Sequence, residues 1–522
     1  MQTIKKKILH GSHALGHLKN LAASGKKIGL CHGHFNVVHP GHLRFLHHAK
    51  ELCEVLVVAL VAQDQLEGEQ KERFFPTQDR AMGVAALLVV DQVVVLEAMS
   101  LEDLISILKP SVFVLGKEFD DEDRKPLVEA YQKLMDAHGG KMVFSSGEVS
   151  YASTESLYAS PDAIHAERLL TFAQACQKSN INLLHLKDKV KAFANQNILV
   201  LGDTIIDQYI ACDALGMSQE APVLAIRELE AREFIGGAAI IACHVQSLGA
   251  NCHFMSVIGK DEKGKTVRDF LSKYNVPSTL FEDPSRQTTF KIRYMVDNQK
   301  LLRVSRLQEH GISKDFERQI LAKLREMAPK LDGIVIADFV YGVITDSLLH
   351  QIQEIAQQHK IRLFGDLQCS SQVGNVTKFT NFHLITPTER EARIALADPE
   401  SGLEKLARKL LNVTQVENLL LTLGASGFIA YVNEGEQGHS SQHFPALCQN
   451  PLDVAGAGDT LLSTFVTSLC AGNNLMESAA LGACASAIAV ARLGNTPITT
   501  KELLAYLDNL NHQLKLHHGK GA

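Results

Sequence analysis

Apolar runs alternate with amphipathic stretches along most of this chain. An apolar run at 27–31 precedes a segment whose apolar positions are 43, 46, 49 and 52, which is the spacing of one helix face. Further strand-like runs in this region lie at 55–62, 92–96, 111–115 and 141–144, with helix-like segments between them. Strands that alternate with helices in this way predict a parallel sheet with helices on both faces.

The alternation begins again at residue 197, after a polar, helix-like segment at 156–195 that contains no strand candidate. The second series of strand candidates is 197–203, 252–258, 333–337, 363–366, 382–386 and 418–423, followed by helices near 477–492 and 500–507. The pattern therefore predicts an α/β protein of two domains, 1–155 and 196–522, joined by a helical linker at 156–195.

The composition is that of a globular protein too long for one core. The 522 residues exceed the length at which a single hydrophobic core stops growing. The formal net charge of -6 gives no basic field, which argues against a nucleic-acid partner. No apolar run has membrane-spanning length, the N-terminal residues lack the apolar core of a secretory signal, and the ten cysteines include no CxxC pair. We therefore expect a cytoplasmic protein with reduced thiols and no membrane partner.

The first candidate site is the turn His39-Pro-Gly-His42, between the strand at 27–31 and the helix that follows. Backbone N–H groups and the dipole at a helix N-terminus favour phosphate. Two imidazoles three residues apart can contact the same anion, and Gly41 lets the backbone approach closely. The turn therefore predicts a nucleotide site in which His39 and His42 are catalytic, because they stabilise the charge that develops on the phosphates.

Residues 25–155 resemble the nucleotidyltransferase family that carries the HxGH motif. The resemblance rests on 33–36 (GHFN), the HxGH turn, 76–80 (PTQDR), 115–117 (LGK) and 153–154 (ST). It implies a Rossmann-like parallel sheet. The residues that it places on the nucleotide or its phosphates are Gly33, Phe35, Gly41, Lys71, Arg80, Ser153 and Thr154. Lys71 lies in a charged run at 67–73 and fits a solvated loop equally well.

The second candidate site is a glycine turn at 456–459 (GAGD), which precedes a helix of small and apolar residues. The backbone N–H groups of Gly456, Ala457 and Gly458 can hold one anion at the helix N-terminus, such as a transferring γ-phosphate. The carboxylate of Asp459 sits at the same point and can accept the proton of an attacking hydroxyl. The turn predicts a phosphoryl-transfer site with Asp459 as the catalytic base.

Residues 195–510 resemble the ribokinase-like (PfkB) sugar kinases, because further motifs accompany the glycine turn. These motifs are Gly202-Asp203, the turn 236–239 (GGAA) and the segment 422–427 (TLGASG). The residues that the resemblance implies are Asp203, Gly236 and Gly237 for the sugar, Thr422, Gly424 and Gly427 for the nucleotide, and Glu391 for a metal–water network. It also implies an α/β/α domain with a small β lid. ATP would bring Mg²⁺ as the cofactor, and no protein residue is predicted as a metal ligand. The lid would come from 207–234 and 285–305, and such kinases commonly form homodimers through it.

The whole arrangement resembles the bifunctional ADP-heptose synthases, with the two modules in reversed order. The resemblance implies that one module transfers a nucleotidyl group from ATP or CTP to a sugar 1-phosphate, and that the other phosphorylates a sugar phosphate with ATP. In such enzymes the products feed lipopolysaccharide core assembly. The motifs leave open the base, the sugar and its anomer, and the oligomeric state.

Five positions of the kinase-like region depart from the family pattern. These are Ile240 and Thr388 in place of Asn, Tyr341 and Gln368 in place of Lys, and Ala455 in place of Thr. An Asn-to-Ile change removes both hydrogen-bonding groups, and two Lys losses remove two charges from the pocket of an anionic substrate. One alternative is therefore an active nucleotidyltransferase whose kinase-like domain is catalytically degenerate and serves dimerisation or ligand sensing. Another is a transferase that uses CTP and a polyol phosphate.

Overall fold

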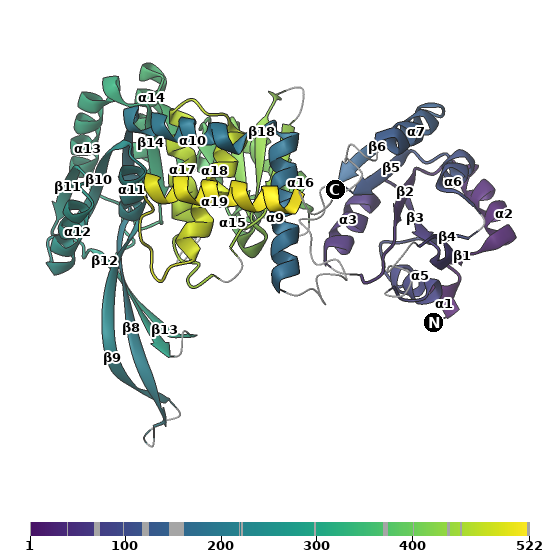
Figure 1. Cartoon of the computed structure of the whole chain (residues 1–522), viewed down its shortest axis with the longest axis horizontal. Coiled ribbons are helices and arrows are strands. Elements are labelled where there is room, and N and C mark those ends of the chain that lie inside the picture. The colour runs from purple at the N-terminus through teal and green to yellow at the C-terminus, as the bar shows by residue number, and fades with distance from the viewer. Residues whose placement is uncertain are drawn as a thin grey trace. The chain divides into compact units, whose positions relative to one another are not determined.

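A computed structural model of the chain shows two compact units, which Figure 1 draws as cartoons. The residues that it describes are 2–38, 40–66, 74–97, 99–116, 125–145, 161–218, 220, 223–296, 299–368, 374–399, 401–435, 439–448 and 451–518. Unit 1 consists of Met1–Ser160 with Asp398–Leu406, and unit 2 of Pro161–Ala397 with Ala407–Ala522. Each unit is built around its own sheet, which is parallel in unit 1 and mostly parallel in unit 2.

Unit 1 contains a six-stranded sheet in the order β1-β4-β3-β2-β5-β6, and all of its pairings are parallel. Its strands are β1 (Ile8–Leu9), β2 (Ile28–Gly33), β3 (Val55–Val61), β4 (Gln92–Leu96), β5 (Val112–Gly116) and β6 (Lys141–Ser145). Its helices are α1 (Gln2–Lys5), α2 (Gly11–Ala22), α3 (Pro40–Glu51), η1 (Gln63–Gln65), α5 (Thr77–Ala85), α6 (Leu101–Leu108) and α7 (Lys125–Asp136). The order reverses at β2, because the chain runs outward through β3 and β4 on one side and through β5 and β6 on the other.

Alternate residues of these strands enter two separate cores, one on each face of the sheet. Leu30 and Val57 belong to the core that α2, α6 and α7 cover, whereas Cys31 and Val58 belong to the core that α3 and α5 cover. A strand that is buried on both faces reads as a continuous apolar run, which is why β3 was visible in the sequence. The expected sheet with helices on both faces is confirmed.

The main sheet of unit 2 has nine strands in the order β11-β10-β7-β14-β15-β16-β17-β18-β19. They are β7 (Asn197–Gly202), β10 (Asn251–Gly259), β11 (Ser278–Asp283), β14 (Gly333–Asp338), β15 (Arg362–Leu367), β16 (Leu384–Ile385), β17 (Asn418–Thr422), β18 (Phe428–Asn433) and β19 (His439–Phe444). The sheet is parallel from β11 to β17, and β18 and β19 add antiparallel pairs at one edge.

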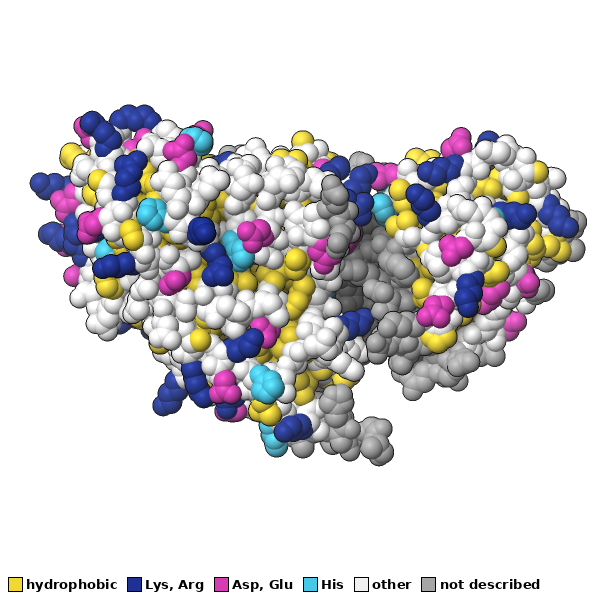
Figure 2. All heavy atoms as spheres, turned by 90° about the horizontal axis from the view of Figure 1, so that it is seen from above, with side chains coloured by type: hydrophobic (Ala, Val, Ile, Leu, Met, Phe, Trp, Pro, Cys, Tyr) yellow, Lys and Arg dark blue, Asp and Glu magenta, His cyan; other side chains and the backbone are white. Residues whose placement is uncertain are grey.

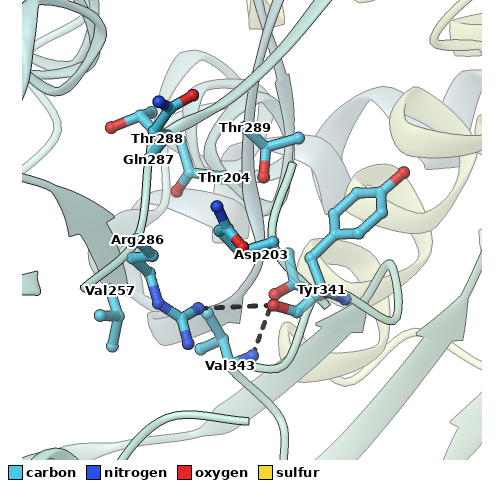
Figure 3. A pocket seen from close by; sticks show the side chains of 10 residues that line it. Asp203, Thr204, Val257, Arg286, Gln287, Thr288, Thr289, Tyr341 and Val343 are labelled. Atoms are coloured by element: carbon cyan, nitrogen blue, oxygen red, sulfur yellow. Dashed lines mark hydrogen bonds between the residues drawn. The ribbon is translucent and has the colours of Figure 1, made fainter. Parts of the chain in front are cut away.

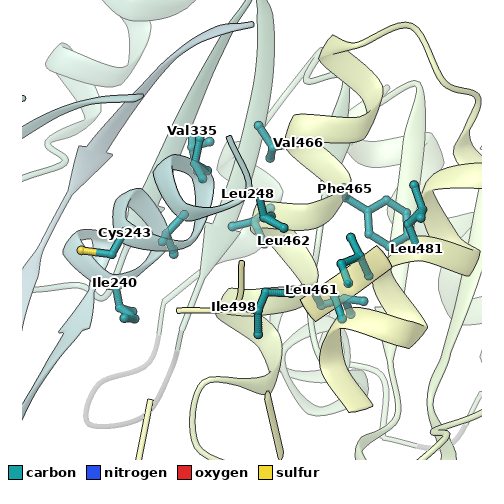
Figure 4. Close-up of a cluster of buried hydrophobic side chains, with 14 of the residues drawn as sticks. Ile240, Cys243, Leu248, Val335, Leu461, Leu462, Phe465, Val466, Leu481 and Ile498 are labelled. Carbon is teal, nitrogen blue, oxygen red and sulfur yellow. The ribbon is translucent and has the colours of Figure 1, made fainter. Parts of the chain in front are cut away.

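Helices from distant parts of the chain complete unit 2. They are α9 (Pro161–Lys178), α10 (Leu183–Lys191), η4 (Ala192–Asn195), α11 (Ala238–Ser247), α12 (Glu262–Lys273), α13 (Lys314–Met327), η5 (Ala328–Lys330), α14 (Asp346–His359), η6 (Val376–Lys378), α15 (Glu389–Leu396), α16 (Leu403–Thr414), η7 (Gly424–Ser426), α17 (Ala457–Cys470), α18 (Leu475–Val490) and α19 (Thr500–His518). Figure 4 shows the apolar cluster where α11 meets α17 and α18, with Ile240, Leu462 and Phe465 among its members. This buried cluster fixes the start of α17, where the GAGD turn lies.

A separate four-stranded sheet projects from unit 2 as a lid (Figure 1), in the order β13-β12-β8-β9. Its strands are β8 (Thr204–Met217), β9 (Leu224–Gly237), β12 (Thr289–Val296) and β13 (Gln299–Arg306). The base of β8 is buried, whereas Leu215 and Met217 near its tip are 62% and 64% exposed. The lid that the family resemblance implied is therefore present. β8 and β9 span 204–237, where 207–234 was expected, and β12 and β13 span 289–306, where 285–305 was expected.

The connector region from 161 to 195 is helical, and its helices are part of the core of unit 2. Phe172 of α9 is fully buried and lies edge-on to Phe444 of β19, with ring centroids 6.2 Å apart. Lys189 of α10 forms an ion pair of 2.6 Å with Glu477 of α18. The domain boundaries at 155 and 195 stay a prediction, but the described part of the connector packs on the unit that follows it.

Surface features are consistent with the modest net charge. Figure 2 shows acidic and basic side chains interspersed over the face that it presents. Among the described residues, the structure contains no helix that combines the length and the apolar character needed to cross a membrane.

Candidate active sites

The HxGH turn of unit 1 lies at the point where the strand order of the sheet reverses. β2 ends at Gly33 and α3 begins at Pro40, so the turn connects the carboxyl end of β2 to a helix N-terminus. β2 pairs with β3 on one side and with β5 on the other. In open α/β sheets, ligands bind in the crevice outside the carboxyl ends of the strands at such a reversal. The position of the turn thus agrees with a nucleotide site.

Phe35 supports His42 within this turn. Phe35 is buried, and its ring centroid lies 4.9 Å from that of His42. A side chain at Gly33 would place a Cβ 3.0 Å from the Phe35 ring, so glycine leaves room for this packing. Phe35 also has a positive φ of 45°, an uncommon backbone conformation for a residue other than glycine, which the surrounding turn must hold in place.

Arg80 of α5 holds the turn through the backbone. The guanidinium is almost fully buried and donates to the carbonyl oxygens of His34 at 2.7 Å and Phe75 at 2.9 Å. Burial lowers the pKa of Arg80. Asn36 adds a second link, because its Oδ1 accepts the backbone N–H of Phe75 at 2.7 Å. The structure thus gives Arg80 an anchoring role, and its contact with phosphate stays a prediction.

The remaining predicted residues of the first site divide into two groups. Gly41 is buried in the first turn of α3, next to His42. His39, Lys71, Ser153 and Thr154 lie outside the described residues. Their roles stay predictions.

The GAGD turn of unit 2 forms the start of α17. Gly456 has a φ of +82°, a left-handed conformation that glycine adopts without strain. Ala457 is the first residue of the helix, with Gly458 following it, and Asp459 lies in its first turn with 7% exposure. The structure therefore places a buried carboxylate beside the backbone N–H groups of a helix N-terminus.

Two side-chain amides contact Asp459 from other parts of the chain. Asn495 donates from Nδ2 to Oδ2 of Asp459 at 2.9 Å, and Gln368 donates from Nε2 to Oδ1 at 3.4 Å. Burial, with a smaller contribution from Asp207, raises the pKa of Asp459 to about 6, although the hydrogen bonds from Asn495 and Gln368 and the charge of Lys291 oppose the rise. A carboxylate with this pKa is ionised at neutral pH and can accept a proton.

Asp366, at the end of β15, is the neighbour of this base. Thr386 donates to its Oδ1 at 2.8 Å, and Gln368 donates to its Oδ2 at 3.5 Å. Burial raises the pKa of Asp366 to about 8, and the nearby carboxylates of Asp459 and Glu391 add to the rise. Gln368 thus bridges two carboxylates and brings no positive charge to either.

Glu391 lies in the first turn of α15, where Thr388 takes over the capping role. The Glu391 carboxylate accepts the backbone N–H of Thr388 at 2.9 Å and its hydroxyl at 2.8 Å, while the Thr388 hydroxyl accepts the N–H of Glu391. This reciprocal capping box keeps the helix start intact despite the change from asparagine. Thr388 also forms a bridge with Thr422, the last residue of β17, so the segment predicted for the metal–water network lies beside the one predicted for the nucleotide.

The turn after β17 needs both of its glycines. Gly424 and Gly427 have φ values of +61° and +88°. A Cβ at Gly427 would lie 2.1 Å from the carbonyl oxygen of Phe444, so no side chain fits there.

Asp203 follows β7 and is enclosed by the turn at 338–343. Its carboxylate accepts backbone N–H groups from Phe339, Tyr341 and Val343, at 2.9, 3.2 and 3.1 Å. Burial raises the pKa of Asp203 to about 7, and the neighbouring carboxylate of Asp338 adds to the rise. Asp203 therefore holds this turn together, and its expected contact with sugar stays a prediction.

A polar pocket opens beside Asp203 and the base of the lid (Figure 3). Its lining residues are Asp203, Thr204, Val257, Arg286, Gln287, Thr288, Thr289, Gln308, Tyr341 and Val343. The buried Arg286 is already engaged with the carboxylate of Asp283 at 3.0 Å and with the carbonyl oxygens of His310 and Tyr341. The pocket is thus walled by groups that mainly support the fold.

Charged residues from the lid face the base, although sequence reasoning did not select them. Asp207 of β8 forms an ion pair with Arg293 of β12, and Asp207 and Lys291 both act on the pKa of Asp459. Lys291 is buried, with its Nζ 5.2 Å from the ring centroid of Tyr341. The available signal was the alternation of β12, which puts Lys291 and Arg293 on one face of the strand.

The glycine turn at the end of β9 brings the lid close to this region. A Cβ at Gly236 would lie 2.7 Å from the carboxylate of Asp207, and one at Gly237 would lie 2.4 Å from the carbonyl oxygen of Asp203. Ile240, three residues later, is fully buried among apolar side chains. Both glycines therefore allow close packing of β9 against β7 and β8.

The carboxylates do not form a preformed metal cage. Within the described residues, no group of three or more His, Cys, Asp or Glu side chains is placed to hold a metal ion. Mg²⁺ commonly binds through one or two carboxylates together with substrate phosphates and water. Asp366 and Glu391 are the carboxylates that fit such a partial role beside Asp459.

Two family models match different parts of the chain. Residues 195–501, more than half of the chain, match the family described as pfkB family carbohydrate kinase. The chain belongs to the pfkB family. Outside the pfkB region, residues 30–141 match the family described as cytidylyltransferase-like.

Relatives of known description are named as bifunctional proteins. The chain is 30% identical over 319 residues to the bifunctional protein HldE of Trichlorobacter lovleyi, which is 60% of this chain and 63% of the relative. It is 31% identical over 313 residues to the bifunctional protein HldE of Geobacter metallireducens, which is 59% of this chain and 62% of the relative. The chain therefore spans less than two thirds of the length of these relatives.

A solved structure supports the fold of the pfkB region. The phosphofructokinase-2 of Escherichia coli, in complex with substrates and products, matches 60% of this chain and 99% of its own length with a TM-score of 0.50. The sequence identity is 17%, so this likeness concerns the fold alone.

Proposed function

We propose that the chain is a bifunctional transferase of nucleotide-sugar synthesis. Unit 1 would transfer a nucleotidyl group from ATP or CTP to a sugar 1-phosphate, and the pfkB unit would phosphorylate a sugar phosphate with ATP. The observation that carries the proposal is the buried Asp459 at the start of α17, because it joins a proton acceptor to a helix N-terminus.

The kinase step follows from this arrangement. The ionised carboxylate of Asp459 would accept the proton of the sugar hydroxyl while the oxygen attacks the γ-phosphorus of ATP, and ADP would leave with the β–γ bridging oxygen. The backbone N–H groups at 456–458 stabilise the charge that develops on the transferring phosphoryl group. Lys291 adds positive charge from the lid, which suits an acceptor that already carries phosphate, whereas the charge of Arg293 is paired with Asp207.

Mg²⁺ would enter this site with ATP. Asp366 and Glu391 would hold it together with the phosphates of the nucleotide, and the ion would neutralise part of the phosphate charge. A bound cation would also favour the ionised form of Asp366, whose pKa burial raises to about 8.

The nucleotidyl step would take place at the HxGH turn. The sugar phosphate oxygen attacks the α-phosphorus of the nucleoside triphosphate, and pyrophosphate leaves. His42, supported by Phe35, and His39 would stabilise the charge on the phosphates together with the N-terminus of α3. The carboxyl ends of β2 and β5 meet at this point, which supports a nucleotide in the crevice.

The biological setting of the proposal follows the relatives. Their printed name says that they are bifunctional, which supports two activities, and the resemblance of the sequence to the ADP-heptose synthases supports the sugar and the setting. We propose a heptose phosphate as the sugar, lipopolysaccharide core as the destination of the product, and the cytoplasm as the location. The exposed apolar side chains near the lid tip, Leu215 and Met217 among them, support a homodimer formed through the lid.

A second candidate is an active nucleotidyltransferase with a pfkB unit that has lost catalysis and serves dimerisation or ligand sensing. The observation that favours it is Gln368, because a neutral side chain between Asp366 and Asp459 leaves the two carboxylates without a paired charge. Ile240 has the same implication, since it offers no polar group at a position where the family has asparagine.

A kinase assay separates the two candidates. The full chain is incubated with ATP, Mg²⁺ and a panel of sugars and sugar phosphates, and ADP release is measured. The bifunctional proposal expects turnover that Asp459→Asn lowers by about 10²–10⁴-fold, the usual contribution of a general base. No turnover on any sugar, with nucleotidyl transfer intact, would favour the second candidate.

A pyrophosphate-release assay tests the first unit with labelled ATP and CTP and a panel of sugar 1-phosphates and polyol phosphates. His42→Asn should lower the rate by about 10²–10³-fold, because it removes a group that stabilises developing charge. The nucleotide that competes better identifies the base. An unchanged rate in His42→Asn would contradict the assignment of the site.

A further inference from the structure

The loop between α18 and α19 carries an amide that no motif selected. We propose that Asn495 is a positioning residue that holds the carboxylate of Asp459 for proton transfer, and that His244 fixes the orientation of its amide. The inference rests on the proposed kinase function, because it assigns a task to Asp459.

The hydrogen bonds form one directed chain. His244 Nδ1 accepts the backbone N–H of Ile498 at 3.4 Å, so its proton resides on Nε2. That Nε2 lies 3.3 Å from Oδ1 of Asn495 and 3.1 Å from the hydroxyl of Thr460. With Oδ1 engaged as an acceptor, the Nδ2 of Asn495 faces Asp459 and donates to its Oδ2 at 2.9 Å.

The protonation state of His244 keeps this direction fixed. His244 is fully buried, and burial lowers its pKa to about 4, with the charge of Arg492 acting in the same direction. The ring is therefore neutral at physiological pH and presents one donor and one acceptor. A reversed amide would set the Oδ1 of Asn495 against the carboxylate of Asp459 and lose both hydrogen bonds.

Packing holds the Asn495 side chain from both sides. A Cβ at Gly456 would lie 2.1–2.4 Å from the atoms of the Asn495 amide, so the amide lies directly against the GAGD turn. On the other side, the backbone N–H of Gly494 donates to Asp453 at 3.2 Å, and a Cβ at Gly494 would lie 2.3 Å from Phe234 of the lid strand β9. The loop is therefore wedged between the glycine turn and the base of the lid.

The hydrogen bond from Asn495 opposes the rise that burial causes in the pKa of Asp459. Of the influences on Asp459, burial and Asp207 favour the protonated form, whereas the hydrogen bonds from Asn495 and Gln368 and the charge of Lys291 favour the ionised form. Three other charged or titratable groups lie nearby. Asp366 has its pKa raised by Asp459, Arg293 is paired with Asp207, and Asp453 lies near Arg293. Among the hydrogen bonds, the one from Asn495 is the shorter and has the larger effect.

The test uses the full chain and compares Asn495→Leu and Asn495→Asp with wild type. Asn495→Leu removes the donor at similar volume, and Asn495→Asp replaces it by a second carboxylate. The matched control is Asn473→Leu, which removes another buried amide, bonded to Ser468 at 2.8 Å, away from Asp459. The pH profile of kcat and the KM for ATP are measured for each.

We expect the acid limb of the kcat–pH profile to move up by about one pH unit in Asn495→Leu and further in Asn495→Asp. On that limb kcat falls by up to about tenfold per pH unit, since one pKa unit is a factor of ten in the ionised fraction. The KM for ATP should change little. His244→Phe should move the limb in the same direction by less, because Nδ2 is then no longer oriented. A limb that stays in place, or that behaves as in Asn473→Leu, would overturn the inference.

A second readout works without turnover. The free energy of unfolding is measured against pH for wild type, for Asn495→Leu, and for each combined with Asp459→Asn. The pH dependence that Asp459→Asn abolishes reports the pKa of Asp459. If the pKa of Asp459 rises in Asn495→Leu but wild type turns over no sugar, the kinase function is rejected, and the effect of Asn495 on Asp459 is still supported. An unshifted value would reject the inference, whatever the activity.

Discussion

Three buried aspartates, Asp203, Asp366 and Asp459, lie near the ends of strands or at a helix start in unit 2, and each has a different set of partners. Asp203 accepts three backbone N–H groups, Asp366 accepts a hydroxyl and a distant amide, and Asp459 accepts two side-chain amides. Burial is the largest cause of the raised pKa in all three. The value is highest for Asp366, about 8, where the carboxylates of Asp459 and Glu391 are both close.

Asp366 therefore makes stability depend on pH. Its folded pKa of about 8 lies above the ordinary 3.8, so the folded state binds the proton more tightly than the unfolded state. Its contribution to stability is present below pH 4 and is lost as pH rises towards 8. We expect Asp366→Asn to weaken this dependence, so that wild type loses more unfolding free energy between pH 5 and pH 8.5 than the variant does.

Urea denaturation at several pH values measures this difference. Asp269→Asn, at an exposed position on α12, is the matched control and should follow wild type. Equal pH dependence in wild type and Asp366→Asn would contradict the protonated state assigned to Asp366.

Val340, in the turn around Asp203, has a strained backbone conformation. It has a φ of +62°, although the left-handed region is strongly disfavoured for a β-branched residue. Its backbone N–H donates to Asp338 at 2.7 Å, which helps to hold the conformation. We expect Val340→Gly to raise the free energy of unfolding by about 1 kcal/mol, because glycine removes this strain.

Thermal and urea unfolding of the pfkB unit in the full chain can check the gain. Val340→Ala serves as the control, since it removes the branched methyl groups and keeps the Cβ. A loss of stability in Val340→Gly larger than that in Val340→Ala would mean that side-chain packing outweighs the backbone strain.

At the scale of elements, the start of α17 depends on two glycines in different ways. A Cβ at Gly456 would overlap Asn495, whereas a Cβ at Gly458 meets no atom within 4 Å. Gly456 also needs its positive φ, and Gly458 lies inside the helix. The first glycine is therefore required by the fold of the turn, and the second leaves space that a ligand can approach.

Alanine substitutions should separate these roles. We expect Gly456→Ala to lower the free energy of unfolding by about 2–4 kcal/mol, from the left-handed φ and the overlap together. Gly458→Ala should raise it by about 0.5–1 kcal/mol, because alanine is the better helix former. Equal effects of the two changes on urea unfolding would contradict the packing of Asn495 against Gly456.

The sequence was sufficient for the elements that are buried on both faces. The central strands β3, β4, β14 and β17 were predicted within a residue or two, because a fully buried strand is a continuous apolar run. The strands β1, β11, β18 and β19 were not predicted. β1, β11 and β19 lie at sheet edges and are short or only partly buried, whereas β18 forms antiparallel pairs outside the strand–helix alternation. The lid strands came from the family resemblance, because their tips are exposed and their apolar pattern is weak.

The candidate site was predictable only where its residues form a compact motif. The GAGD and HxGH turns are local, so spacing identified them. Asn495, His244 and Asp207 come from three separate segments, and only the packing of α11, the lid and the last loop brings them to Asp459. The family resemblance assigned Asp203 to the sugar, and that role stays a prediction. The three backbone N–H groups that its carboxylate accepts could not be predicted, because they come from the distant turn at 338–343.

At the scale of the whole molecule, the pfkB unit extends beyond the region that matches its family. The match begins at residue 195, but α9 and α10 precede it and belong to the same core. The residues that they bury are Leu169, Phe172, Ala175, Cys176, Leu183, Leu186 and Val190. Burial of each large apolar side chain contributes about 1.5–3 kcal/mol, so the two helices contribute substantially to this core.

Two fragments would test this extension. The fragment 161–522 should unfold cooperatively, whereas the fragment 196–522 should unfold at lower urea concentration or aggregate, because it exposes the surface under α9 and α10. Circular dichroism in urea and light scattering make the comparison. Equal stability of the two fragments would show that the helices are dispensable.

The placement of these two helices bears on how such a protein can be rearranged. Arg168 of α9 donates to the carbonyl oxygen of Cys448, and Lys187 of α10 pairs with Asp508 of α19, so the segment is attached to distant parts of the unit by polar contacts as well. A recombination that joined another module directly at β7 would discard these contacts and uncover an apolar surface. Crossovers compatible with folding therefore lie before residue 161, and a kinase module moved within a gene would have to carry both helices with it.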